Sequence, residues 1–184
     1  MEIVVVKSSG PDDPDRVYLR DARGSRRAAV HVVHDLPHLA VESALGLDDG
    51  LWAELAAGAH DESARAATAR HPRRRKWGRI VSGAAEGVTT EEWLTPGHRR
   101  AKTVTNAVAN RFGDGPDTPA GVRHRLAAAG DPEIDAVVAG LGDDDIAEAI
   151  RLVAELDARW AATVPGGTLR LSWPLGPVRD GSFR

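Results

Sequence analysis

The segment TLRLSW, residues 168–173, decides the fold, because it predicts a strand at the C-terminal end of a chain whose middle is helical. Leu169, Leu171 and Trp173 alternate with polar residues, which is the period of two expected for a strand with one buried face. The Pro-Gly-Gly run at 165–167 ends the preceding helix. A single strand cannot bury its apolar face alone, so we expect it to join a sheet formed by the N-terminal part of the chain.

The first third of the chain supplies the other strands of that sheet. Residues 3–6 (IVVV) form a β-branched run that is typical of a strand buried on both faces. A turn at 21–24 (DARG), between two alternating segments, predicts a hairpin. We therefore predict an α+β fold, with one small, mainly antiparallel sheet covered by several helices. Its strands are expected over residues 2–7, 16–20, 26–34 and 168–173.

Apolar residues at helical spacing dominate the region between these strands. Asp35 is a candidate N-cap for a helix that ends at Gly46, and Asp48 or Asp49 is one for a short helix that ends at Gly58. Helices are also predicted over 61–70 and 101–111. Thr118-Pro119 opens a predicted helix over 118–129, and Asp131-Pro132 opens one over 132–139. The last predicted helix, 144–163, is capped by Asp143.

The composition predicts one globular domain. The chain has 184 residues, of which 42% are hydrophobic and 28% are charged, and this is enough for a single core. We expect one domain over residues 1–174 and a loose tail over 175–184. The net charge of −3 disfavours nucleic acid as a partner of the whole molecule.

The absence of cysteine excludes a disulfide scaffold, a thiol nucleophile and a cysteine-ligated metal, and it is typical of intracellular proteins. Glu2 and the lack of an extended apolar segment after it disfavour a secretory signal, and no apolar run approaches the length of a membrane span. We expect a cytoplasmic location. The abundance of Ala, Arg, Gly and Asp relative to Lys indicates a GC-rich bacterial genome.

The stretch HVVHDLPHLAVE, residues 31–42, contains the candidate metal site. His34, His38 and Glu42 follow one another at i, i+4 and i+8, and histidine and carboxylate side chains are common ligands of divalent metals. They would share one face of a continuous helix, but Asp35 as the N-cap would leave His34 at the end of the preceding strand. The predicted ligand set is His34, His38 and Glu42, with Asp35 nearby.

Two alternatives to a metal ion are open at this corner. A helix N-terminus carries about half a positive charge, which costs a divalent cation roughly 3 kcal/mol at ~5 Å and an effective dielectric of ~20. The same field favours a small anion, held by the free N–H groups after Asp35 and by His38 as a donor, and this second interpretation includes a general acid–base site. In the third interpretation the corner is structural, and the histidines only make hydrogen bonds there.

The segment HDLPHLAVESALGLDDGLW, residues 34–52, resembles a stretch found in bacterial proteins of unassigned function. The resemblance covers these residues only and implies no particular activity, cofactor or substrate. It indicates that the corner around His34 and His38 matters.

The segment RHPRRRKWGR, residues 70–79, supports an alternative function as a non-enzymatic interaction module for nucleic acid or a partner protein. Basic side chains with an interleaved aromatic ring can follow a phosphate backbone and stack on a base. A solvated basic loop, or one docked on the acidic 143–145 turn, is the simpler interpretation. The residues concerned are Arg73, Arg74, Arg75, Lys76 and Trp77.

A second set of polar residues, His98, Lys102 and Asn106, follows a four-residue spacing that places them on one helical face. Such a stripe is usually the solvent side of a helix, but it could bind a small anionic ligand if it faced the histidine stretch. The sequence contains no G-x-G-x-x-G after a strand, Walker A loop, G-x-S-x-G or H-E-x-x-H motif. Their absence disfavours Rossmann redox chemistry, nucleotide hydrolysis, serine hydrolysis and zincin proteolysis.

Overall fold

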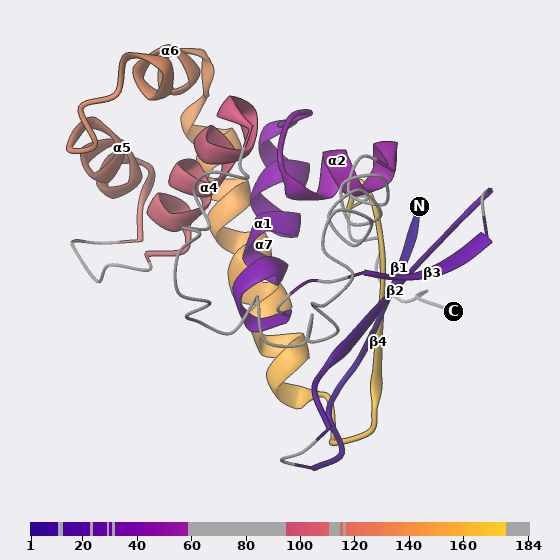
Figure 1. The fold of residues 1–184 in the computed structure, drawn as a ribbon. Coiled ribbons are helices and arrows are strands. Elements are labelled where there is room, and N and C mark those ends of the chain that lie inside the picture. Colours follow the sequence, from indigo (N-terminus) through magenta and orange to yellow (C-terminus); the bar gives the residue numbers. More distant parts are fainter. Residues whose placement is uncertain are drawn as a thin grey trace, which may run out of the picture.

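The computed structural model describes residues 1–10, 13–22, 24–28, 30, 32–58, 95–110, 115 and 117–175. Within these residues, one face of a four-stranded sheet is turned toward two long helices, α1 (Val32–Leu45) and α7 (Asp143–Ala162), and the other helices lie beyond or beside them (Figure 1). The fold is α+β, as the sequence predicts.

The sheet is antiparallel throughout and has the order β3-β2-β1-β4. Its strands are β1 (Glu2–Val6), β2 (Arg16–Asp21), β3 (Gly24–Ala28) and β4 (Thr168–Ser172). The C-terminal strand pairs with β1, where Ile3 lies opposite Leu171 on one side and Leu19 on the other. All three side chains are buried, because alternate residues of each strand face the helices. The predicted hairpin and the return of the C-terminal strand are both confirmed.

The prediction of a strand over residues 26–34 is wrong in its second half. β3 ends at Ala28, and α1 begins at Val32. Val32 fits the alternation of the preceding residues, but with Leu36 and Leu39 it also forms a buried stripe at i, i+4 and i+7, and this helical pattern prevails. Asp35 therefore lies in the first turn of α1 and is not its N-cap.

The remaining helices begin at local start signals. The predicted caps Thr118 and Asp131 are confirmed, since their side chains accept hydrogen bonds from the N–H groups of Gly121 and Glu133. The N-cap of α7 is Gly142 in place of the predicted Asp143. These helices are α2 (Leu51–Ala57), α4 (Pro96–Val108), α5 (Pro119–Ala127) and α6 (Pro132–Gly140). The helix predicted over 61–70 lies outside the described residues.

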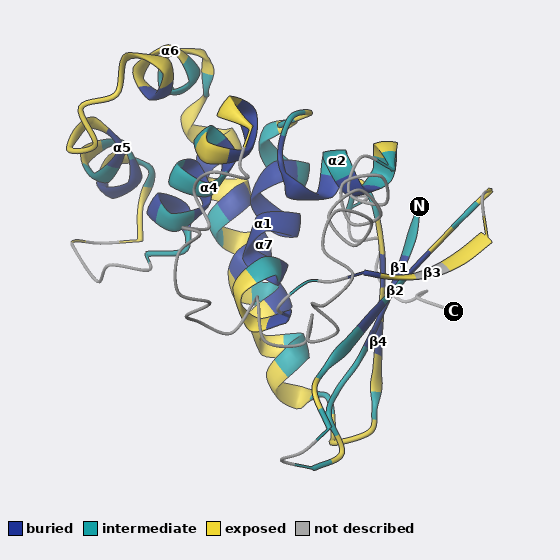
Figure 2. Ribbon diagram, in the orientation of Figure 1, coloured by how far each residue is buried: buried dark blue, intermediate teal, exposed yellow. Residues whose placement is uncertain are grey.

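The core lies between the sheet and the helices and continues between α1 and α7, which make the most extensive contact of any two helices in the described part of the chain (Figure 2). Next to β4, the backbones of Met1 and Trp173 exchange two hydrogen bonds, and Leu175 N–H donates to Ser43 Oγ on α1. These contacts attach Met1 to the residues after β4, and attach Leu175 to the helical layer. None of the helices in the described ranges combines the length and apolar character needed to cross a membrane.

Candidate metal centre

Three side chains in the first two turns of α1 form a group with the chemistry of a metal site. His34, Asp35 and His38 each offer one ligand atom, and these atoms all lie within 4.8 Å of one another. The imidazole rings of His34 and His38 are 5.6 Å apart between centroids. They meet because α1 is continuous from Val32, so that residues i and i+4 share a face.

His34 and Asp35 form the outer part of this group. The two side chains are in contact, with His34 Nδ1 at 2.7 Å from Asp35 Oδ1. The His34 side chain is 50% exposed, whereas that of Asp35 is 13% exposed. The backbone of Asp35 is also fixed from the core side, because the indole Nε1–H of the buried Trp52 donates to its carbonyl oxygen at 2.9 Å. The group therefore lies at the surface but is anchored to the core.

His38 forms the buried part of the group, with 2% of its surface exposed. Its Nδ1 atom lies 3.4 Å from Glu42 Oε1, one helical turn further along α1, and 3.4 Å from Thr105 Oγ1 on α4. Both contacts involve the same ring nitrogen. The opposite ring nitrogen, Nε2, is therefore the one that can serve another ligand.

Glu42 is 1% exposed and is not one of the three grouped side chains. Its carboxylate caps α2: Oε1 accepts a hydrogen bond from Leu51 N–H at 2.9 Å, and Oε2 accepts one from Trp52 N–H at 2.8 Å. These N–H groups have no partner within a helix that starts at Leu51. The predicted caps Asp48 and Asp49 are wrong, since Gly50 occupies the N-cap position without a side-chain hydrogen bond.

The lack of a side chain at Gly50 makes room for Glu42. A Cβ atom built on Gly50 would lie 2.3 Å from Glu42 Cδ and 2.6 Å from each carboxylate oxygen. Glu42 thus occupies the place that the side chain of a local N-cap residue would take. Sequence reasoning missed this role because capping rules examine neighbouring residues, and Glu42 precedes Leu51 by nine positions.

The predicted polar stripe, His98, Lys102 and Asn106, lies on α4. A different residue of α4 contacts His38. His98 is buried and contacts Glu54 on α2, with Nδ1 at 3.4 Å from Oε2. Lys102 and Asn106 are half-buried. Thr105, which the stripe omits, is the α4 residue that reaches His38.

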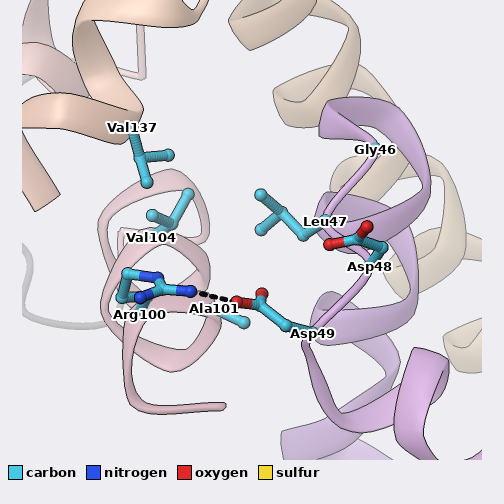
Figure 3. Close-up of a pocket in the computed structure, with 8 residues that line it drawn as sticks. All are labelled: Gly46, Leu47, Asp48, Asp49, Arg100, Ala101, Val104 and Val137. Carbon is cyan, nitrogen blue, oxygen red and sulfur yellow. Dashed lines mark hydrogen bonds and ion pairs between the residues drawn. The ribbon is translucent and has the colours of Figure 1, made fainter. Parts of the chain in front are cut away.

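A separate pocket of about 210 Å³ lies between the α1–α2 connection and helices α4 and α6, and it contains none of the grouped residues. Figure 3 shows Leu47, Val104 and Val137 pointing toward one another across it. Arg100 pairs with Asp49 at its edge and with Glu133 at 3.1 Å, and these hydrogen bonds raise the pKa of Arg100, Asp49 contributing most. Both carboxylates help to hold the guanidinium in place there.

The basic segment lies outside the described residues, including its candidates Arg73, Arg74, Arg75, Lys76 and Trp77. Comparison with protein-family models, with curated proteins and with solved structures gives no match for this chain.

Proposed function

We propose that this protein binds a divalent transition-metal ion, with Zn²⁺ as the first candidate, through His34, Asp35 and His38. The observation that carries the proposal is the grouping of one ligand atom from each side chain within 4.8 Å. Ligand atoms at about 2.0–2.2 Å from a shared tetrahedral ion lie about 3.3–3.6 Å apart. Small side-chain adjustments therefore suffice to close the group on a metal.

The donor set selects the class of metal. Two imidazole nitrogens and one carboxylate oxygen suit Zn²⁺ and its first-row neighbours, whereas Ca²⁺ and Mg²⁺ prefer sites made of oxygen ligands. Three protein ligands leave one position of a tetrahedral ion for water or for a small ligand. Because His34 is half exposed, that position can be reached from solvent.

The charges around His34, Asp35 and His38 favour a bound cation over the small anion that is the alternative in the sequence analysis. The first turn of α1 repels a cation, but Asp35 contributes a negative charge at the site, and Glu42 contributes a second one below His38. An anion here would face two carboxylates.

The test is Zn²⁺ binding by protein that carries no affinity tag, measured by metal analysis after dialysis and by calorimetry. We expect one Zn²⁺ per chain, and at a free concentration about 100 times Kd a stabilisation of about 2.7 kcal/mol, or roughly 5–10 °C in Tm. His34→Ala should weaken binding by at least about tenfold. It should leave the unliganded fold intact because the side chain is half exposed.

The matched control is His124→Ala, which removes an exposed histidine on α5. This variant should retain the wild-type Zn²⁺ affinity. Protein that holds no Zn²⁺ after dialysis and shows no change in Tm with Zn²⁺, Co²⁺ or Ni²⁺ would contradict the proposal, as would equal loss of binding in both variants.

A further inference from the structure

One carboxylate connects the grouped histidines to a second helix. Glu42 Oε1 lies 3.4 Å from His38 Nδ1 and accepts the Leu51 N–H at 2.9 Å, while Oε2 accepts the Trp52 N–H. Both Glu42 and His38 are almost fully buried, so bulk solvent does not compete for either contact. The same side chain therefore touches a proposed metal ligand and the first turn of α2.

We infer that Glu42 is a positioning residue: it holds His38 in the tautomer that presents Nε2 to the metal, and it thereby couples metal binding to the attachment of α2. The inference rests on the proposed function. It adds that metal binding stabilises the attachment of α2 to Glu42. It also gives Glu42 a supporting role in place of the ligand role predicted from its spacing.

The tautomer follows from the donors and acceptors around His38. A carboxylate that accepts two N–H groups presents lone pairs to its surroundings, so the ring nitrogen beside it is favoured as the N–H donor. That nitrogen is Nδ1, and Thr105 Oγ1 at 3.4 Å can share the same proton. Nε2 then keeps its lone pair. Metal-binding histidines commonly donate their other ring N–H to a carboxylate in this way.

The coupling to α2 follows from the sharing of this carboxylate. If α2 separates from Glu42, the carboxylate loses the two N–H groups that fix its position, and His38 loses its orientation. Metal affinity is then lower in the opened state. By linkage, a bound metal must oppose the opening to the same degree.

The variant Glu42→Gln tests this inference. Its carbonyl oxygen can replace only one carboxylate oxygen. In the place of Oε1 it keeps the Leu51 N–H and the His38 contact but turns its NH₂ group toward Trp52 N–H, and in the place of Oε2 it turns that group toward Leu51 N–H and His38. In both orientations one N–H of α2 faces a donor, and the negative charge beside His38 is lost. We expect Zn²⁺ affinity to fall by about 10–100-fold. In the metal-free wild type, nitrogen NMR of His38 should show the proton on Nδ1, and Zn²⁺ should slow hydrogen exchange of the Leu51 and Trp52 amides by about tenfold.

Two controls separate positioning from general loss of stability. Val122→Ala destabilises α5, which contributes none of the grouped residues, and should leave Zn²⁺ affinity within about twofold of wild type. Thr105→Val removes the other contact of His38 Nδ1 and should have a much smaller effect than Glu42→Gln.

The outcomes also separate this inference from the proposed function. A wild-type protein that binds no Zn²⁺ contradicts the proposed function. A wild-type protein that binds Zn²⁺ while folded Glu42→Gln binds it equally well leaves the proposed function standing and overturns the positioning role. A metal-free wild type in which the His38 proton resides on Nε2 also overturns it.

Discussion

A carboxylate that is 1% exposed must find hydrogen-bond donors inside the protein, and Glu42 finds them in the N–H groups of Leu51 and Trp52. Gly50 is the complement of this arrangement, because its backbone fits against the carboxylate only without a Cβ atom. Its φ of −87° is open to any residue, so the requirement for glycine at this position is one of space and not of backbone conformation.

Gly50→Ala should therefore destabilise the protein by about 1–3 kcal/mol, because the added methyl group must displace the buried Glu42 side chain. Urea unfolding measures the change. Gly140→Ala is the matched control: nothing lies within 4 Å of its Cβ position, and a change below about 0.5 kcal/mol is expected. Equal stability of the two variants would show that Glu42 is not held where the structure places it.

Part of the site was predictable at the residue scale. The pairing of His34 with His38 follows from their spacing of four on a helix. Asp35 was expected near the histidines but was assigned as a cap because the start of α1 was placed too late, and its place in the group, instead of Glu42, became visible only in three dimensions. The cap formed by Glu42 depends on how α2 folds back onto α1, and no local pattern encodes that.

At the scale of the single helix, α7 carries a network of surface ion pairs, and the pH dependence of stability tests its contribution. Arg151 donates to Glu148 Oε1 at 2.6 Å and to Glu155 Oε2 at 2.9 Å. The hydrogen bond from Arg151 lowers the pKa of the Glu148 carboxyl below its ordinary value of 4.5. Because the folded pKa lies below the unfolded one, the stabilisation is present above the unfolded value and is lost as pH falls through the folded pKa.

Glu148→Gln should accordingly cost less than about 1 kcal/mol at pH 7, because Glu148 and Arg151 are both about half exposed and solvent screens the pair. The cost should vanish once the pH is below the folded pKa of Glu148, where the wild-type carboxyl is also neutral. Denaturation series at both pH values measure it. A cost that is independent of pH would indicate that Arg151 does not act through the charge of Glu148.

Element types were easier to predict than element boundaries. The strands at both ends and the amphipathic stripe of α7 are strong local patterns, and all of them are present. The start of α4 at Pro96 was missed, although Thr95-Pro96 is the same kind of signal as Thr118-Pro119 and Thr95 Oγ1 accepts from His98 N–H. The predicted boundary between β3 and α1 was wrong because Val32 fits both the period of two of a strand and the period of about 3.6 of a helix.

At the scale of the whole molecule, β1 is the strand that brings the N-terminal hairpin together with β4. It pairs with β2 on one side and with β4 on the other, and the sheet shares one apolar core with α1 and α7. The prediction of a single domain over residues 1–174 implies that the sheet and the helices unfold together.

Leu171→Ala tests this implication. The side chain is 3% exposed and lies on β4 opposite Ile3, so its removal should cost about 2–5 kcal/mol. Circular dichroism in the far and near ultraviolet should give one common unfolding midpoint, shifted to lower denaturant concentration. Helices that persist after the sheet has unfolded would show two independent units.

The central claim is that α1 presents a metal site, and X-ray absorption at the zinc edge of protein loaded with one equivalent of Zn²⁺ tests it most directly. The expected spectrum shows two imidazole nitrogens at about 2.0–2.1 Å together with oxygen ligands, and His34→Ala should remove one imidazole contribution. A first shell of oxygen atoms alone, or an imidazole contribution unchanged in His34→Ala, would contradict it.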